Sequence, residues 1–67
     1  MDTLYQQKKS ALTRDRIIIA TLQCIIEFGY VSTSVAKIAK LAQLSTGALR
    51  YHFESKIDAI KAAIEYL

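Results

Sequence analysis

The residues best suited to chemistry in this sequence are hydrogen-bonding and cationic side chains in its central part. They are Lys37, Lys40, Thr46, Arg50, Tyr51 and His52. No acidic residue occurs from Phe28 to Phe53, so no carboxylate neutralises these groups along the chain. A cationic, donor-rich surface beside apolar positions suits a polyanion such as nucleic acid.

The same inventory gives little support to catalysis or metal binding. The chain has one histidine and one cysteine, Cys24, and its formal net charge is +3. These residues offer no nucleophile–base pair and no spacing typical of a zinc site, so no catalytic residue, cofactor or metal is expected. Cys24 cannot pair within the chain, which fits a reducing cytoplasm. The longest apolar run is far short of the roughly 18 residues that a membrane span requires.

A chain of 67 residues is long enough for one small domain. Residues 1–12 show no sustained apolar period and are predicted to form a mobile arm, with a helical end as an open alternative. Thr13 is predicted to cap the first helix, and Gly29 to end it. The residues predicted to face the core from this helix recur at helical spacing: Ile18, Leu22, Ile25 and Phe28.

Two shorter helices joined by a tight turn are predicted next. Ser32, Thr33 and Ser34 are consecutive cap candidates for the second helix, Val35 to Leu41, and Ser45 is a cap for the third, Thr46 to Phe53. The residues predicted to pack inward from this part are Ile38, Ala39, Leu44, Leu49 and Phe53. The layout over residues 34–53 is that of a helix-turn-helix, whose second helix enters the DNA major groove.

A fourth helix is predicted to begin at Lys56 after the cap Ser55. One face of this helix is apolar and contains Ile57, Ile60, Ile64 and Leu67. Of these, Ile60, Ile64 and Leu67 are expected to stay exposed. The first three helices are not expected to cover this face, so we expect the helix to lead into a further domain. The predicted fold class is all-α: a small bundle of about four helices with a homeodomain-like helix-turn-helix, truncated before a C-terminal domain.

From Thr13 to Leu67 the sequence resembles the TetR (tetracycline-repressor-like) family of bacterial transcriptional regulators. The segments that carry the resemblance are Glu27-Phe28-Gly29-Tyr30, Thr33-Ser34-Val35, Gly47-Ala48-Leu49, His52-Phe53 and Ser55-Lys56. The resemblance implies a cytoplasmic, ligand-responsive repressor that binds double-stranded DNA at a palindromic operator. It also implies a C-terminal domain that binds a small-molecule effector and forms the homodimer.

Two residues depart from the family pattern. Gln43 stands where the family usually has a turn glycine, and a positive φ there would cost a non-glycine residue on the order of 1 kcal/mol. Arg50 stands where the family often has a tyrosine directed at the DNA backbone, and Tyr51 follows it.

The candidate DNA-binding residues are Ser34, Ser45, Thr46, Gly47, Ala48, Arg50, Tyr51, His52 and Lys56. Arg50 can fork onto a guanine edge or clamp a phosphate, and base reading is preferred. Thr46 and Ala48 are placed near base edges. Tyr51 and His52 are expected to contact the DNA backbone, although a structural role for His52 is an equal alternative.

Several alternatives stay open at this point. Gly47 fits close approach to DNA and a close helix crossing equally well. Lys56 fits a phosphate contact at a helix N-terminus or a solvated surface. Lys8 and Lys9 fit a minor-groove arm or an uninvolved basic terminus.

The alternative function is a helical protein-interaction or membrane-surface module. It would use the apolar face of the fourth helix, Ile57 to Leu67.

Overall fold

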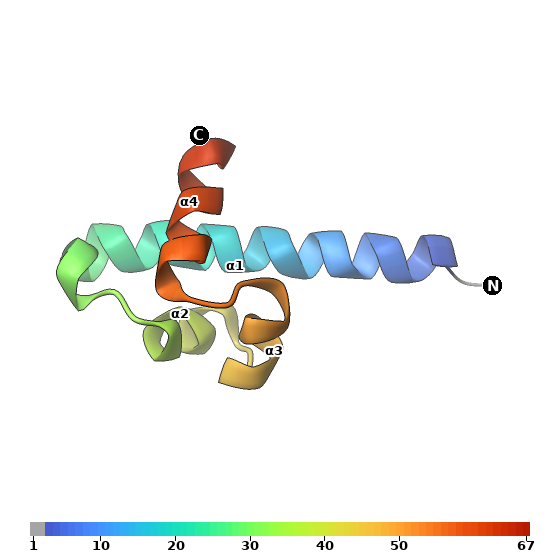
Figure 1. Ribbon diagram of the computed structural model, residues 1–67, viewed down its shortest axis with the longest axis horizontal. Coiled ribbons are helices and arrows are strands. Elements are labelled where there is room, and N and C mark those ends of the chain that lie inside the picture. The colour runs from blue at the N-terminus through green and yellow to red at the C-terminus, as the bar shows by residue number, and fades with distance from the viewer. Residues whose placement is uncertain (1–2) are drawn as a thin grey trace.

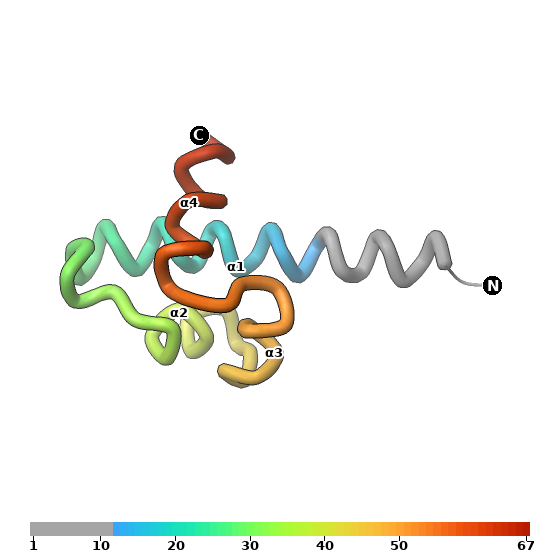
Figure 2. Tube along the Cα trace, in the orientation of Figure 1, coloured from blue at the N-terminus to red at the C-terminus, as the bar shows by residue number. Residues whose placement is uncertain are grey.

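The computed structural model describes residues 3–67, with side chains from residue 12 onward. Its helices are α1 (Thr3–Ser32), α2 (Val35–Ala42), α3 (Thr46–His52) and α4 (Lys56–Tyr66). In Figure 1, α1 runs along the length of the molecule, α2 and α3 lie below it, and α4 crosses it and extends upward. The chain path in Figure 2 passes from α1 through α2 and α3 before returning to α1 as α4. The predicted all-α fold with a helix-turn-helix is confirmed.

The cap predicted at Thr13 is wrong, because Thr13 lies inside α1. The sequence placed an arm over residues 1–12 and a cap at Thr13, whereas α1 begins at Thr3. Neither proline nor glycine occurs before Gly29, so no residue type in this segment stops a helix from extending towards the N-terminus. Lys8 and Lys9, for which a minor-groove arm and an uninvolved terminus were left open, fall outside the residues whose side chains the structure describes.

Gly29 interrupts α1 close to its C-terminal end, as predicted. Its φ of 82° and ψ of 164° lie in a region that is open essentially only to glycine. A Cβ atom at this position would meet nothing within 4 Å, so the requirement for glycine is conformational. The Thr33 hydroxyl, which is buried, donates to the Gly29 carbonyl at 2.8 Å and closes the turn that leads to α2.

The core lies where α1 packs against α2 and α4, and α3 packs against α2. Its buried residues are Ile17, Ile18, Ala20, Cys24, Ile38, Ala39, Ala42, Leu49, Phe53, Ala59, Ala62 and Ala63. All predicted core residues of α2 and α3 and the C-cap Phe53 are confirmed as buried. Leu22 and Leu44 are partly buried against the same cluster.

The inward face of α1 differs from the predicted stripe. Phe28 is 42% exposed, so its assignment to the core was wrong, and Ile25 is only half-buried. The buried face is instead centred on Ile17, Thr21 and Cys24, which recur at steps of four and three residues. Three consecutive isoleucines, 17 to 19, left the centre of the apolar face of α1 ambiguous. The buried small residues Ala20 and Cys24 lie on the face that packs against the other helices.

The inward face of α4 also differs from the expectation. Ala59, Ala62 and Ala63 are buried, and Ile60 is 7% exposed, so its predicted exposure was wrong. Small side chains let the axes of two helices approach closely, which gives an alanine face more contact than a count of large residues suggests. Ile57, Ile64, Tyr66 and Leu67 remain exposed.

Hydrogen bonds confirm the predicted caps Ser45 and Ser55 and identify Ser34, among the three candidates, as the cap of α2. The side chain of Ser34 accepts from the Lys37 amide at 3.2 Å. Ser45 accepts from the Ala48 amide at 3.1 Å, and Ser55 from the Asp58 amide at 3.3 Å. Each cap satisfies an amide that a helix start leaves without an intrahelical partner, worth about 1 kcal/mol per helix.

Candidate nucleic-acid interface

The helix α3 separates an apolar inner face from a polar outer face. Leu49 is fully buried, and Phe53, which caps the helix, is 6% exposed. Thr46 and Arg50 are exposed on the other side. Within the described residues the Arg50 guanidinium makes no hydrogen bond, so its donors are available to an external acceptor.

The two aromatic rings that follow Arg50 differ in exposure. Tyr51 is 84% exposed, and His52 is half-buried. Their ring centroids lie 5.2 Å apart in an edge-to-face arrangement with an interplanar angle of 80°. Tyr51 therefore contributes little to the core, and its ring and hydroxyl project from the domain beside His52.

Gly47 has no packing role in this fold. A Cβ atom at this position would meet only the Ser45 Oγ, at 3.9 Å, which is an ordinary contact distance. The close-crossing explanation for this glycine therefore fails. Gly47 still lowers helix stability by about 1 kcal/mol relative to alanine, and packing within the domain does not account for it.

The hydroxyl groups of the capping serines can also donate a hydrogen bond to a ligand. Ser34 and Ser45 use an oxygen lone pair to cap α2 and α3. A hydroxyl group has one hydrogen to donate in addition to its acceptor positions. Ser34 is half-buried and Ser45 is exposed, so each hydroxyl hydrogen can point to an acceptor near the N-terminus of its helix.

The two lysines of α2 differ in their contacts. The Lys37 ammonium donates to the Ser32 carbonyl at 2.9 Å and lies 4.7 Å from the centroid of the Phe28 ring. Lys40 is exposed in the last turn of α2. Neither lysine was assigned an individual role from the sequence, although the acid-free central segment contains both.

Lys56 makes contacts that neither sequence interpretation included. Its Nζ donates to the Tyr30 carbonyl at 3.1 Å and lies 3.5 Å from the Val31 carbonyl. The same ammonium is 4.9 Å from the centroid of the Tyr30 ring. Lys56 therefore joins the start of α4 to the end of α1, where the carbonyl groups carry the negative end of the helix dipole.

The turn between α2 and α3 contains the second positive-φ residue of the described chain. Gln43 has φ 60° and ψ 44°, a left-handed conformation that costs a non-glycine residue on the order of 1 kcal/mol. The sequence predicted this cost on the condition of a positive φ, and the condition is met. The Leu44 amide donates to the Ala39 carbonyl at 2.9 Å, so the turn is closed by backbone bonds typical of helix C-termini.

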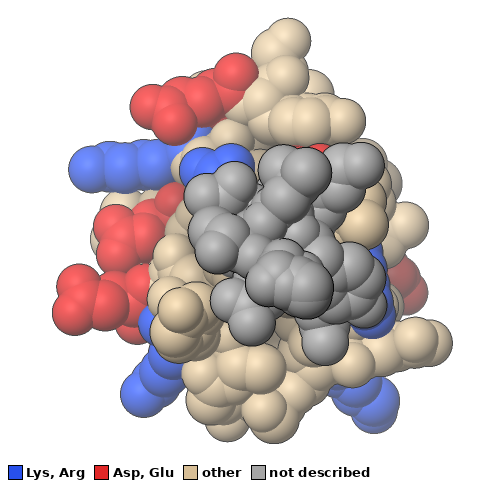
Figure 3. Space-filling view, turned by 90° about the vertical axis from the view of Figure 1, so that its right-hand side faces the viewer, with Lys and Arg blue, Asp and Glu red and all other residues tan. Residues whose placement is uncertain are grey.

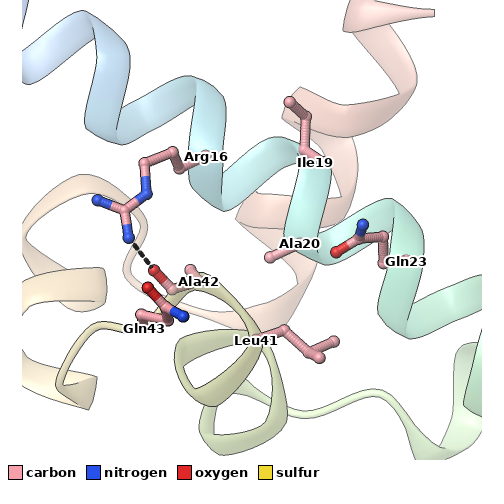
Figure 4. A pocket seen from close by; sticks show the side chains of 7 residues that line it. All are labelled: Arg16, Ile19, Ala20, Gln23, Leu41, Ala42 and Gln43. Atoms are coloured by element: carbon pink, nitrogen blue, oxygen red, sulfur yellow. Dashed lines mark hydrogen bonds between the residues drawn. The ribbon is translucent and has the colours of Figure 1, made fainter.

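Arg16 supports this turn from α1. Its guanidinium donates to the carbonyl of Ala42, the last residue of α2. The pocket beside this bond has a volume of about 200 Å³ and lies between α1 and the end of α2 (Figure 4). Arg16 has no role that the sequence predicts, because no local pattern indicates a contact 26 residues away.

Charge is distributed unevenly around the domain. Along the lower edge of Figure 3, on the side where α2 and α3 lie, only lysine, arginine and uncharged side chains are visible. Acidic side chains appear higher in the same view. The lower part of the face seen in Figure 3 therefore carries positive charge and no visible acidic side chain.

The described residues form neither a metal site nor a membrane span. In that part of the chain, no three His, Cys, Asp or Glu side chains come together in a way that could hold a metal ion. None of the described helices is both long enough and apolar enough to cross a membrane.

Comparison with known proteins identifies the family. Residues 17–63 match the model of the bacterial regulatory proteins of the tetR family. An uncharacterized HTH-type transcriptional regulator of Mycobacterium bovis is 42% identical over 57 residues, which cover 85% of this chain and 29% of the relative. No solved structure gives a significant match.

Two further relatives have more specific names. The HTH-type transcriptional regulator BetI of Ectopseudomonas mendocina is 32% identical over 56 residues, which cover 84% of this chain and 29% of that protein. The HTH-type transcriptional repressor BepR of Brucella suis is 34% identical over 56 residues, which cover 84% of this chain and 27% of that protein. The chain thus spans less than a third of the length of these relatives. With the family model matched along most of its length, the chain belongs to the TetR family of bacterial transcriptional regulators and forms its helix-turn-helix DNA-binding domain.

Proposed function

We propose that this domain reads double-stranded DNA in a sequence-specific way, with α3 lying in the major groove. The observation that carries the proposal is the two-sided character of α3. Leu49 anchors the helix in the core, while Arg50 and Tyr51 project outwards without a packing role. A helix anchored by its apolar side can present its other side to base edges.

Within this proposal, the outer residues of α3 have different tasks. Arg50 forks onto the O6 and N7 atoms of a guanine, while Thr46 and Ala48 lie near thymine methyl groups. Gly47 allows the backbone to approach the DNA closely. Tyr51 and His52 contact the sugar–phosphate backbone, which fixes the register of the helix without reading sequence.

The proposed phosphate contacts come from the start of each short helix. Ser34 and Ser45 donate their hydroxyl hydrogens, and Lys56 adds charge at the N-terminus of α4. An ammonium group has three donor hydrogens. With the Tyr30 and Val31 carbonyls as neighbours, Lys56 keeps a donor for a phosphate and is held in position to use it.

For the whole protein, we propose a homodimeric, effector-responsive repressor acting in the bacterial cytoplasm. The relatives are more than three times as long as the matched segment, and α4 exposes Ile57, Ile64 and Leu67 by 54%, 63% and 86%. An apolar face of this kind suits contact with a further domain that binds the effector and forms the dimer. Two recognition helices would then read half-sites about 34–36 Å apart in a palindromic operator.

The same α4 face is the basis of the alternative function, a protein-interaction or membrane-surface module. Its polar residues mix Lys61 with Asp58 and Glu65, so it lacks the cationic side that membrane-surface helices use. The observation therefore favours a protein contact over a lipid contact, and such a contact is compatible with DNA reading by α3.

Fluorescence anisotropy with labelled DNA tests the proposed function. The chain should bind duplex DNA with an affinity that falls steeply as salt is raised, because binding releases counterions from phosphates. Selection from a randomised duplex library should return a defined short motif. Equal affinity for anionic liposomes, or no enriched motif, would contradict the proposal.

A further inference from the structure

Arg16 connects α1 to the turn that precedes the recognition helix. In Figure 4 its guanidinium points from α1 to the Ala42 carbonyl, and Gln43 is the next residue of the turn. Over the described residues, Gln43 is the only non-glycine with a positive φ. The Arg16 guanidinium is therefore bound at the C-terminal end of α2. It lies beside Gln43, whose left-handed backbone conformation is unfavourable for a glutamine.

The conformation of this turn determines where α3 points. α3 has seven residues and packs mainly against α2, so the turn controls its direction relative to the remaining helices. A glutamine would shift to negative φ if nothing held the neighbouring backbone, because the left-handed region is sparsely populated by such residues. That shift would displace Leu44 and Ser45, and with them the N-terminal end of α3.

We infer that Arg16 is a positioning residue for the recognition helix: its bond to Ala42 holds the Gln43 turn in the conformation that DNA binding requires. This inference rests on the proposed role of α3 in reading DNA. A domain whose turn has relaxed does not bind, so the apparent affinity falls with the fraction of domains in the competent state. A glycine at position 43 would adopt the left-handed conformation without support, which makes the role of Arg16 dependent on Gln43.

A double-mutant cycle tests this dependence. The variants are Arg16→Ala, Gln43→Gly and the double variant, each titrated against a labelled duplex recovered by randomised selection with the wild-type chain. Arg16→Ala should lower the affinity about tenfold, and the double variant should return to within about twofold of Gln43→Gly. A double variant as weak as Arg16→Ala would overturn the inference.

Arg14→Ala is the matched control, because it removes the same charge from the same helix. The Arg14 guanidinium lies 5.4 Å from the centroid of the Phe53 ring, at the other end of α3. Its effect on affinity should simply add to that of Gln43→Gly, as expected of independent sites. If Gln43→Gly rescues both arginine variants equally, the rescue is a general gain in stability and the inference fails.

The salt dependence separates positioning from direct DNA contact. A lost phosphate contact reduces the slope of log affinity against log salt by about 1. Arg16→Ala should leave this slope unchanged, because the number of phosphates contacted by the competent domain stays the same. A slope reduced by about 1 without rescue by Gln43→Gly would make Arg16 a phosphate ligand instead.

Amide hydrogen exchange measures the turn without DNA. The Leu44 amide, which donates to the Ala39 carbonyl, should exchange faster in Arg16→Ala and return to wild-type protection in the double variant. The Ile38 amide, which donates to the Ser34 carbonyl, should exchange at the same rate in all variants. Unchanged Leu44 exchange would overturn the inference.

If Arg16→Ala unfolds, the double variant must refold, and an unfolded double variant would also overturn the inference. A wild-type chain that binds no duplex would refute the proposed function, while the exchange data would still decide the role of Arg16 in the turn.

Discussion

The two C-terminal helices begin in the same way but expose opposite kinds of side chain. α3 and α4 each follow a serine cap, Ser45 and Ser55. α3 buries the large Leu49 and exposes Arg50, whereas α4 buries small alanines and leaves Ile64 63% exposed. Anchoring by one large side chain and close packing by several small ones are therefore both used within a single domain.

This difference indicates what each helix meets. An exposed guanidinium and hydroxyl groups are stable in water and gain most from a polyanion. Exposed isoleucine and leucine side chains gain most when another apolar surface removes them from water. The domain accordingly has a surface suited to DNA on α3 and a surface suited to protein on α4.

The largest expected effect is on stability, from truncation of the α3 anchor. Leu49→Ala should lower the free energy of unfolding by about 2–5 kcal/mol, because it removes a fully buried side chain and leaves a cavity. Ile64→Ala, the matched change on α4, should alter it by less than about 0.5 kcal/mol in this chain. Urea unfolding followed by circular dichroism measures both. Equal losses would show that the exposed face of α4 is already packed in the isolated chain.

The next effect is on DNA binding, from removal of the proposed base contact. Arg50→Ala should cost about 1–3 kcal/mol of binding free energy and relax the preference at one base position, without changing stability. Lys61→Ala is the control, because it removes an exposed cation from α4. Randomised selection with each variant measures the preference. A uniform loss of affinity on all sequences would reassign Arg50 to a phosphate.

Replacing each of the two glycines by alanine should change the free energy of unfolding in opposite directions. Gly47→Ala should raise the free energy of unfolding by up to about 1 kcal/mol, because Gly47 is helical and a Cβ atom there meets no close neighbour. Gly29→Ala should lower it by about 1–3 kcal/mol, because the φ of 82° is strained for alanine. Thermal unfolding distinguishes them. Despite its added stability, Gly47→Ala should bind DNA more weakly, and unchanged affinity would remove the close-approach explanation.

The smallest effect is expected for Lys56. Lys56→Ala should weaken binding to every duplex alike and reduce the magnitude of the salt slope by about 1. The Tyr30 carbonyl also loses its ammonium partner, so a lower melting temperature with an unchanged salt slope would assign Lys56 a purely structural role. Anisotropy titrations at several salt concentrations, together with thermal melts, separate the two results.

The features that the sequence predicted correctly are local ones. Ser45 and Ser55, and Ser34 as one of three adjacent candidates, are recognisable because a cap and its helix are adjacent in the chain. The cost of Gln43 was stated on the condition of a positive φ, because the resemblance places a turn glycine of the family at this position. Within α3, the spacing of Leu49 and Phe53 is enough to define the inner face and hence the outer one.

The features that the sequence did not predict depend on contacts between distant residues. Arg16 binds the Ala42 carbonyl and Lys56 the Tyr30 carbonyl, each across 26 positions, and backbone acceptors carry no residue-type signal. Phe28 is large and apolar but 42% exposed, because it lies at the end of α1, directly before the interruption at Gly29, where its ring contacts the Lys37 ammonium. Ile60 was misjudged because alanines were given too little weight in the apolar period of α4.

The most direct test of the central claim is to map DNA contacts on the isotopically labelled chain by NMR. On addition of the selected duplex, the amide signals of Thr46, Gly47 and Arg50 should shift most, because α3 lies against the bases. The signals of Ile64 and Leu67 should stay within the range seen without DNA, since their face of α4 is suited to protein. Shifts concentrated on α4, or an α3 that remains unaffected at saturating duplex, would contradict the account.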